Sequence, residues 1–319
     1  MSDWQPTASL ANLRLRAELL AQLRRFFAER GVLEVDTPAL ARAGATDRHI
    51  HSFRVEDSRG GYLYLHTSPE FPMKRLLAAG SGDIWQLCKV FRSGEAGRMH
   101  NPEFSMLEWY RLGFDHHRLM AETAELIAIL VPGVSLPPEK LTYREAFQLH
   151  AGLDPFSTTP GECRAVLERA GHHSPKVGEL DLDGWLDLLA GERVYPALGK
   201  GGLTFIYDYP VSQAALARLR PGDPPVAERF EAFLQGMELA NGFHELTDVR
   251  DQRHRFEADR NYRNAQGLMD VPTDERLLAA LEQGLPPCAG VAVGFDRLVM
   301  AALKARTIED VIAFPSERA

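Results

Sequence analysis

The sequence lacks the features that mark several large classes of protein. Its three cysteines stand alone, without a Cys-x-x-Cys pair, which argues against a zinc site or a disulfide framework and favours a reducing cytoplasm. Neither a signal sequence nor an apolar run near the ~20 residues of a membrane helix occurs. The net charge of −8 is the opposite of the basic balance of most nucleic-acid binders. We therefore expect a cytoplasmic protein with no membrane contact and no stable tRNA binding.

The glycine loops that hold nucleotides in many enzymes are also absent. The chain contains neither a P-loop nor a Gly-x-Gly-x-x-Gly after a strand. Two other segments each place an arginine where a predicted strand ends: Phe91 to Phe104, which contains Arg92, and Gly290 to Leu298, which contains Arg297. Guanidinium groups suit phosphates well. The two segments therefore indicate a nucleotide held by side chains on a sheet, as in adenylate-forming enzymes.

Hydrophobic periodicity predicts an α+β fold with a mainly antiparallel sheet, because strands are scattered among helices with hairpins between them. Apolar residues at helical spacing run from Asn12 to Arg30 and stop at Gly31. The chain suits a single domain over residues 1–319. Within it, residues 141–200 are expected to form a mostly helical insert.

The strand predicted at residues 104–113, paired with one at 84–92, carries chemical groups on one face. By the two-residue period of a strand, that face holds Phe104, Met106, Glu108 and Tyr110. A carboxylate and a phenol beside two large apolar groups indicate the wall of a pocket. The alternative is an edge strand whose polar face is solvated.

A last core strand, residues 291–294, leads into a predicted helix from Arg297 to Ala305, with Asp296 as its N-cap. Arg297 would then add its charge to the positive end of a helix. Such a position favours a bound anion.

Residues 229–240 predict a tight hairpin around the turn Gln235-Gly236, where glycine supplies the positive φ. A two-residue turn pairs residue 231 with 240, so Glu231 and Glu238 are expected on one face as diagonal neighbours. Two carboxylates that close repel each other unless a cation lies between them, and a divalent metal ion would do this. The alternative is that one of the two points into solvent.

These segments resemble the three signature motifs of class II aminoacyl-tRNA synthetases, and most closely those of the lysyl-tRNA synthetase catalytic domain. The helix from Asn12 running to Thr37-Pro38 resembles motif 1, Phe91-Arg92 through Arg111 resembles motif 2, and Gly290 to Leu298 resembles motif 3. The stretch from Glu231 to Asp248 matches the lysine enzymes further. The resemblance implies an antiparallel sheet flanked by helices, ATP as a substrate, Mg²⁺ as a cofactor, and a homodimer built through the motif 1 helix.

One part of the lysyl-tRNA synthetases is missing. Those enzymes carry an N-terminal anticodon-binding OB domain, whereas here the motif 1 helix begins near the start of the chain. This shortened form resembles the family of ligases that attach lysine, by preference (R)-β-lysine, to a lysine of translation elongation factor P. The resemblance implies that lysine or β-lysine is activated as an aminoacyl-adenylate and transferred to elongation factor P, the expected protein partner.

The resemblance also implies roles for individual residues. Catalysis is assigned to Arg92, Glu238 and Arg297, and magnesium binding to Glu231 and Glu238. ATP binding is assigned to Arg92, Ser93, Gly94, His100, Asn101, Phe104, Glu238, Leu239, Gly294 and Arg297. Amino acid binding is assigned to Ser68, Pro69, Glu70, Glu108, Tyr110, Asn241, Glu245 and Ala292. In this last set, Tyr110 and Glu245 are expected to receive the distal ammonium group.

Two positions depart from the synthetase pattern. Motif 2 usually reads Arg-x-Glu, but here Gly94 separates Ser93 from Glu95. Either Glu95 moves in after a one-residue shift, or the Gly94 backbone contacts adenine. Ala292 stands where lysyl-tRNA synthetases carry glycine, as it does in the elongation factor P enzymes. One added methyl is typically worth ~1–3 kcal/mol of discrimination, and it would favour an amino group displaced by one carbon.

Other charged groups are interpreted as surface features. Histidines without matched metal-ligand spacing are expected in exposed loops: His49, His51, His116, His117, His172 and His173. Arg14, Arg16, Arg24 and Arg25 are expected on the solvated side of the first helix.

Two further functions stay open. A minimal lysyl-tRNA synthetase would charge RNA without an anticodon domain, and a silent regulatory paralogue would bind an amino acid and signal through a partner. Arg92, Glu231, Glu238 and Arg297 together argue against the silent form, which has no need of a complete phosphate clamp. The choice of acceptor, and ATP–pyrophosphate exchange that depends on lysine, would discriminate among the three.

Overall fold

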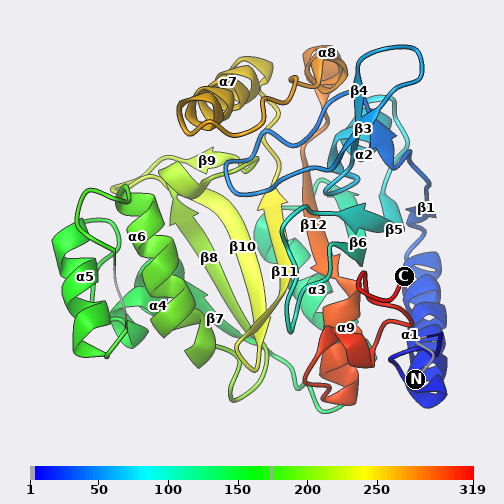
Figure 1. Cartoon of the computed structure of the whole chain (residues 1–319), viewed down its shortest axis with the longest axis horizontal. Coiled ribbons are helices and arrows are strands. Elements are labelled where there is room, and N and C mark those ends of the chain that lie inside the picture. Colours follow the sequence, from blue (N-terminus) through cyan, green and yellow to red (C-terminus); the bar gives the residue numbers. More distant parts are fainter. Residues whose placement is uncertain (1–3, 173–174) are drawn as a thin grey trace.

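A sheet of nine strands runs through the middle of the molecule (Figure 1). In the computed structural model, which describes residues 4–172 and 175–319, the order is β1-β5-β6-β12-β11-β10-β8-β7, with β9 paired to β10. The strands are β1 (Leu33–Glu34), β5 (Ile84–Phe91), β6 (Glu103–Leu112), β7 (Glu139–Thr142), β8 (Thr204–Pro210), β9 (Leu219–Arg220), β10 (Val226–Leu234), β11 (Met237–His244) and β12 (Cys288–Gly294). Only the β1–β5 and β7–β8 pairs among these are parallel, so the predicted α+β fold is confirmed.

Three helices cover one face of this sheet: α1 (Leu10–Glu29), α3 (His116–Leu130) and α9 (Phe295–Leu303). Their apolar sides and the sheet form the main hydrophobic core. Phe27 of α1, for example, is fully buried and stacks on Trp85 of β5, with 4.8 Å between ring centres. Helix α1 begins slightly before the predicted residue because the Ser9 side chain accepts a hydrogen bond from the Asn12 N–H and caps it.

A buried charge network joins α1 to the start of α9 and corrects two predictions. Gly294, not Asp296, is the N-cap of α9, and Asp296 lies in the first turn. The Asp296 carboxylate accepts a hydrogen bond of 2.7 Å from the Ser105 N–H and lies 2.6 Å from an Arg16 guanidinium nitrogen. Arg16 is therefore not on the solvated side of the helix. A buried carboxylate needs such partners, and these contacts tie the three motif segments together.

The segment expected as a mostly helical insert packs on the far end of the sheet. It contains α4 (Tyr143–His150), α5 (Pro160–Arg169), α6 (Leu182–Leu189), the π-helical turn η1 (Ala190–Val194) and the 3₁₀ turn η2 (Tyr195–Ala197). Its side chains form a second core around Trp185, with Tyr209 of β8 and Phe233 of β10. The first residues of the expected insert belong to β7 instead, which extends the sheet.

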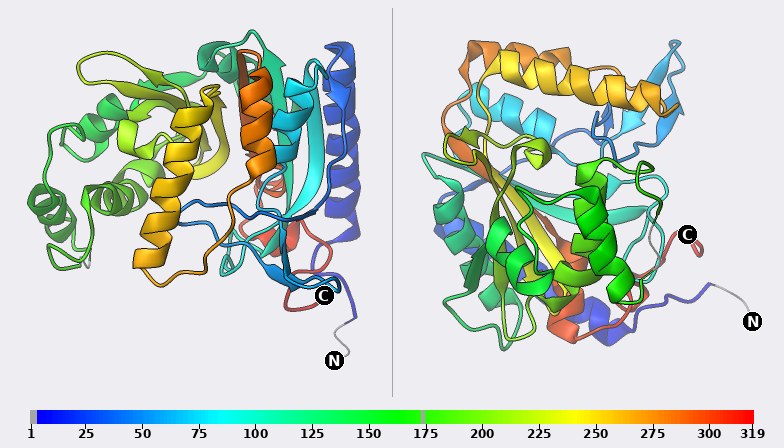
Figure 2. Two further views of the ribbon diagram at one scale, coloured as in Figure 1. Left: turned by 90° about the horizontal axis from the view of Figure 1, so that it is seen from above. Right: turned by 90° about the vertical axis from the view of Figure 1, so that its left-hand side faces the viewer.

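Helices α7 (Val249–Ala265) and α8 (Glu275–Gly284) lie together over the end of the sheet where β11 finishes and β12 begins (Figures 1 and 2). Helix α8 packs on α2 (Glu70–Ala78), and a small sheet of β2 (Leu40–Ala41), β4 (Tyr62–Leu65) and β3 (Arg54–Glu56) lies on the same side. The remaining short turns are η3 (Val211–Gln213) and η4 (Ile308–Asp310). No helix within the described ranges has both the length and the apolar character of a membrane span.

Candidate active site

Five neighbouring strands place one row of side chains across the sheet. Residues directly opposite each other in a ladder share a face. The observed register aligns Gln86 of β5, Glu108 of β6, Ala292 of β12, Asn241 of β11 and Glu231 of β10. Except for the glutamine, all of these are predicted site residues, so the fold brings together groups that are far apart in the sequence.

A cavity of about 460 Å³ lies against this row. Its lining includes the predicted residues Ser68, Glu70, Arg92, Glu108, Tyr110, Asn241, Glu245 and Ala292. Strand β6 is paired on both sides, by β5 and β12, and is not an edge strand. The interpretation of one β6 face as a pocket wall is therefore confirmed, although Phe104 lies outside the lining.

The β10–β11 hairpin contains a bulge that the sequence did not predict. Phe233 pairs with Glu238, as a two-residue turn requires, but Glu231 pairs with Asn241, one residue further along than expected. The extra residue is Leu239, whose buried side chain belongs to the main core. The predicted contact of Leu239 with the nucleotide would therefore have to come from its backbone, since its side chain points into the core. The same bulge lets Glu238 and Asn241 face the same side despite their odd spacing.

Glu108 lies second in the row, between Gln86 and Ala292, and both of its oxygens have partners. Ser68 Oγ donates to Oε2 and the Tyr110 hydroxyl donates to Oε1, each over 2.6 Å. Burial raises the pKa of Glu108 to about 8, the charge of Glu70 adds to this, and the two hydrogen bonds oppose it. A cation beside this carboxyl group would therefore favour its ionised form strongly.

A buried lysine lies between two of the carboxylates expected to bind the amino acid. Lys74 Nζ is 2.6 Å from Glu70 Oε1 and 2.6 Å from Glu245 Oε2. Burial acts to lower the pKa of Lys74, but Glu245 and Glu70 raise it above its ordinary value, so the group stays an ammonium. Burial raises the pKa of Glu245 to about 7, and Lys74 opposes that rise. Glu245 thus already has an internal cation, and a substrate ammonium would share it rather than supply its only partner.

Gly290 allows the backbone of β12 to approach this cluster. A Cβ at this position would lie 2.3 Å from Tyr110 Cε1 and 2.5 Å from Glu245 Oε1, which is closer than real Cβ atoms come. Only glycine leaves room for both side chains. Ala292, two residues further along the same face, adds one methyl group to the cavity lining.

The residues predicted to bind phosphates gather around His100. Arg297 Nη2 is 2.7 Å from His100 Nε2, and Arg297 Nη1 is 3.4 Å from Glu238 Oε2. Burial lowers the pKa of His100, and the positive charges of Arg297 and Arg92 act in the same direction. A neutral imidazole can accept a hydrogen bond from Arg297. Because both arginines act on one imidazole, they lie on the same side of the molecule.

Arg92 lies where the cavity meets this group of residues. Its guanidinium carbon is 5.2 Å from the centre of the Phe104 ring, and its Nη1 is 3.7 Å from Glu95 Oε1. Gly94 has a φ of +85°, in the left-handed region that favours glycine. The chain turns at Gly94, and this turn brings Glu95 into the vicinity of Arg92. The two alternatives for the adenine contact, Glu95 and the Gly94 backbone, both stay predictions.

Glu231 and Glu238 are neighbours, but each has its own arginine. Arg229 Nη2 is 2.5 Å from Glu231 Oε1, and Arg297 is close to Glu238. Burial raises the pKa of Glu231 to about 6, Arg229 lowers it, and the charge of Glu238 raises it. The repulsion that suggested a metal ion is thus partly relieved by the protein itself. The pair still fits Mg²⁺, which usually binds one or two carboxylates together with substrate phosphates.

Four other predicted residues, Asn101, Pro69, Ser93 and Gly294, have structural contacts within the protein. The buried Asn101 amide donates to one backbone carbonyl and accepts from a backbone N–H near the C-terminus. Pro69 precedes α2 as its N-cap residue, and the Ser93 N–H anchors the motif 2 loop by donating to a backbone carbonyl over 2.7 Å. A Cβ on Gly294 would lie 3.6 Å from the Arg297 side chain, which is an ordinary contact.

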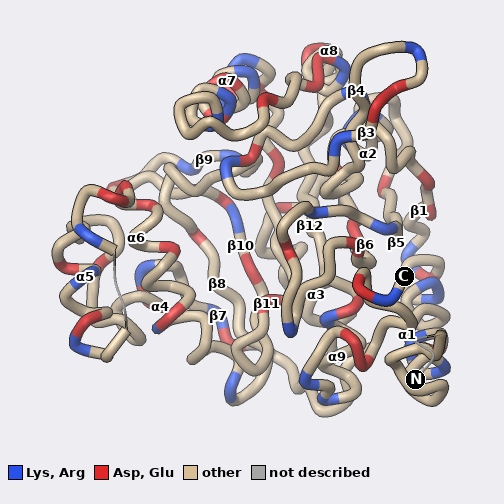
Figure 3. Tube along the Cα trace, viewed as in Figure 1, with Lys and Arg blue, Asp and Glu red and all other residues tan. Residues whose placement is uncertain are grey.

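Lys74 and Arg229 are the functional candidates that the sequence analysis missed. Lys74 follows Glu70 by four residues on α2, and Arg229 precedes Glu231 by two residues on β10. These are the spacings at which residues share a helix face or a strand face. The periodicity could therefore have found both, since each stands beside a carboxylate already predicted. Figure 3 shows both signs of charge on β10.

Comparisons with known proteins show the family of the chain. Residues 2–318 match the family described as tRNA synthetases class II (D, K and N). The chain is 51% identical over 323 residues to the elongation factor P–(R)-β-lysine ligase of Vibrio cholerae, covering 100% of this chain and 99% of that protein. The ligase of the same name from Vibrio vulnificus is 50% identical over 319 residues, 98% of each chain. That of Erwinia tasmaniensis is 51% identical over 326 residues, 100% of each.

Proposed function

The chain belongs to the class II tRNA synthetase family (D, K and N), and we propose that it activates (R)-β-lysine with ATP and joins it to a lysine side chain of elongation factor P. Its relatives at about half identity over their full length are ligases of that name, so the chain is a ligase. The site supports the substrate class, as the following paragraphs argue.

The cluster of carboxylates around Lys74 is the observation that carries the proposal. The Lys74 ammonium group pairs with Glu70 and Glu245, and the charges of these two carboxylates act on Glu108. The pKa values of Glu108 and Glu245 are raised toward or above neutrality. Such a cluster is short of positive charge. An amino acid with two ammonium groups supplies it, whereas one with an apolar side chain would leave the single ammonium group of Lys74 for three carboxylates and be disfavoured.

Arg92 places the other end of the amino acid. It lines the cavity, and the phosphate-binding candidates lie just beyond it. Its planar fork of donors can bridge the carboxylate of the amino acid and the α-phosphate of ATP. A carboxylate oxygen then attacks the α-phosphorus, the bond from this phosphorus to the bridging oxygen of the β-phosphate breaks, and pyrophosphate leaves. Arg297, beside Glu238 and His100, would hold the departing phosphates.

Glu231 and Glu238 are the residues that would hold Mg²⁺ beside the phosphates. A bound ion would neutralise charge on the leaving pyrophosphate. The protein's own contribution is to hold these carboxylates in place, which Arg229 and Arg297 do.

In the second step, an amine nitrogen of elongation factor P attacks the carbonyl carbon of the adenylate. The bond from carbon to the phosphate oxygen breaks, AMP leaves, and the nitrogen loses a proton. Free lysine amines have a pKa of ~10.4, so the acceptor must be deprotonated as it reacts. In this scheme, the phosphate of the adenylate is the base that accepts the proton of the amine.

We also propose a homodimer through the side of the molecule that carries α1. Trp4, Leu10 and Leu33 on that side are 70%, 65% and 54% exposed. Exposed apolar side chains along this side of the molecule fit a contact with a second copy of the chain. Light scattering of the purified protein tests this: a monomeric mass at micromolar concentration would contradict it.

The ligase reaction itself is tested by intact-mass analysis of elongation factor P. The purified protein, ATP and (R)-β-lysine should add the mass of one β-lysyl group to the factor, and Arg92→Ala should not. With labelled lysine, label on tRNA and none on the factor would instead identify a minimal lysyl-tRNA synthetase. Without any lysine-dependent ATP–pyrophosphate exchange, a silent paralogue would be the better description.

A further inference from the structure

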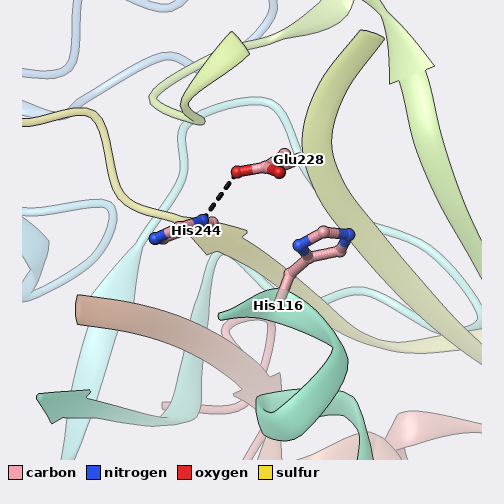
Figure 4. A group of neighbouring side chains, drawn as sticks. All are labelled: His116, Glu228 and His244. Carbon is pink, nitrogen blue, oxygen red and sulfur yellow. Dashed lines mark hydrogen bonds and ion pairs between the residues drawn. The ribbon is translucent and has the colours of Figure 1, made fainter. Parts of the chain in front are cut away.

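A second cluster of potential ligands lies on the opposite face of the sheet from the cavity. One side-chain atom each of His116, Glu228 and His244 lie within 4.8 Å of one another (Figure 4). Side chains alternate between the faces of a strand. Asn241 and Arg229 contribute to the cavity side, and His244 and Glu228 therefore point to the other side, where α3 packs.

His116 is the member that indicates a ligand. It is the first residue of α3, it is 1% exposed, its Nδ1 has no hydrogen-bond partner, and its Nε2 has only the Asp208 carboxylate, 3.7 Å away. Its prediction as an exposed loop histidine is therefore wrong, while His173 lies outside the described residues. Buried polar groups in proteins are normally satisfied. Figure 4 shows one His116 ring nitrogen directed toward His244 and Glu228.

We propose that His116, Glu228 and His244 bind a divalent transition metal ion of the zinc class. Two imidazoles and a carboxylate are a donor set that Zn²⁺ prefers, with bonds of about 2.0–2.2 Å. Ligand atoms around a tetrahedral ion with such bonds lie about 3.4 Å apart, so a separation of 4.8 Å would have to shorten by about 1.4 Å, and the closest pair would have to move apart slightly. His244 Nδ1 and Glu228 Oε2 are already 2.6 Å apart, and the ion would replace the proton between them.

Two neighbouring residues fit this assignment. Asp208 Oδ1 lies 3.7 Å from His116 Nε2, on the nitrogen that the ion would leave free. A carboxylate behind a ligating histidine orients the ring and strengthens binding in many metal sites. Arg220 pairs with Asp208 through Nη2 and lies 3.6 Å from Glu228 through Nη1, at the Oε1 oxygen. The oxygen on the side of His244 is therefore left for the ion.

The ion would connect the start of α3 to β10 and β11, elements distant in the sequence. Since His244 directly precedes Glu245, a bond from the ion to His244 would also hold the end of β11 in place. The next residue, Glu245, is the carboxylate that pairs with Lys74 on the cavity side of the sheet. This assignment does not depend on the reaction of the enzyme, and its test has readouts other than activity.

Zn²⁺ titration of the full-length, chelator-treated protein tests the proposal. Competition with a chromophoric chelator should show one Zn²⁺ per chain, Co²⁺ should give the visible absorption of a tetrahedral site, and Zn²⁺ should raise the Tm. His116→Ala should weaken Zn²⁺ binding at least tenfold, and Asp208→Asn, a change behind the ligand, by ~10–100-fold. His117→Ala is the matched control and should bind as wild type does, because the adjacent His117 is outside the group.

Several results would overturn the assignment. Equal Zn²⁺ binding by the His116→Ala and His117→Ala variants would place the ion elsewhere, and loss of binding in Glu238→Gln alone would place it in the nucleotide site. Absence of any Tm shift or cobalt spectrum in the wild-type protein would refute the site outright. If His116→Ala does not fold by circular dichroism, His244→Gln and Glu228→Gln carry the same prediction.

Discussion

The two ends of the candidate active site handle charge in different ways. At the amino-acid end, the Lys74 and Glu245 side chains are 2% and 1% exposed and pair with each other. At the nucleotide end, the Arg297 and Glu238 side chains are 21% and 43% exposed, and their contact is longer. A buried charge needs a partner of opposite sign, so a buried site binds only ligands that supply the matching charge. A half-exposed charge can be solvated by water and can therefore exchange one partner for another. Under the proposed function, we therefore expect the first end to give selectivity and the second to bind phosphates reversibly.

Removal of the buried cation should have the largest effect. In Lys74→Met, Glu70 and Glu245 lose their shared partner, and loss of one member of a buried pair typically costs ~3–5 kcal/mol. We expect the free energy of unfolding in urea to fall by that order. Adding Glu245→Gln to the variant should recover part of the loss, since one uncompensated carboxylate disappears. A double variant as unstable as the sum of the two single variants would show that the residues do not act as a pair.

At the nucleotide end, Arg92→Ala should leave the fold intact and remove activity. Loss of one preorganised donor typically reduces kcat by ~10²–10³, and we expect lysine-dependent ATP–pyrophosphate exchange to fall accordingly, with little change in Tm. Arg98→Ala is the matched control, because Arg98 lies exposed in the same motif 2 loop. Equal losses in both variants would mean that the loop as a whole, rather than the Arg92 guanidinium, is required.

Gly290→Ala should weaken binding of the amino acid without removing or adding a charged group. Its new methyl group would enter space held by Tyr110 and Glu245, and such overpacking typically costs ~1–3 kcal/mol. The KM for the amino acid should rise more than the KM for ATP. Gly201→Ala, at a position with open space around it, should change neither constant. A rise confined to the KM for ATP would contradict the division of the site into two ends.

The raised pKa of Glu108 predicts that binding depends on pH. With a pKa of about 8, the Glu108 carboxyl group is mostly protonated at neutral pH in the free protein. If its carboxylate pairs with a substrate ammonium group, binding must release this proton. Affinity for the diamino acid should therefore fall as the pH drops below about 8, approaching tenfold per unit, when measured by calorimetry. Titrations in buffers of different ionisation enthalpy should detect the released proton, and Glu108→Gln should abolish the release.

The sign for stability is the opposite of that for binding. Folding raises the pKa of Glu108 from 4.5 to about 8, so across this window the folded protein holds a proton that the unfolded chain releases. Its contribution to the free energy of unfolding must therefore decrease as the pH rises through the window, by up to about 1.4 kcal/mol per unit. Glu108→Gln should flatten this part of the profile. A steeper profile in the variant would contradict the assignment.

The sequence predicted the row of site residues well because the row depends on local patterns. Two-residue alternation on β6 placed Glu108 and Tyr110 together, and the motif resemblance supplied Ala292 and Asn241. What it missed depends on packing. The bulge at Leu239 follows from burial of that side chain in the core. The two-residue alternation of a strand does not predict a bulge.

The contacts of charged and polar side chains also depend on packing, which the sequence pattern does not show. Asp296 was predicted as a helix cap because its position in the sequence suits one, but Arg16 and Ser105 reach it from other elements. His116 was expected at the surface because a loop setting was assumed, and its burial follows from the position of α3 on the sheet. Pairing across elements cannot be read from spacing along one of them.

Ala292 gives the smallest expected effect and the finest test of the amino-acid end. Its neighbours in the row are Glu108 and Asn241, so its methyl group lies between a group expected to bind an ammonium and one expected to bind the carboxylate. Ala292→Gly should make room for an amino group one carbon nearer the carboxylate and so improve the use of α-lysine relative to (R)-β-lysine. One methyl is worth ~1–3 kcal/mol at most, so we expect a shift of about tenfold in the ratio of kcat/KM for the two isomers in ATP–pyrophosphate exchange. Because the charges of the site are untouched, kcat/KM for ATP should stay constant, and an unchanged isomer ratio would leave the choice of isomer to the carboxylates around Lys74.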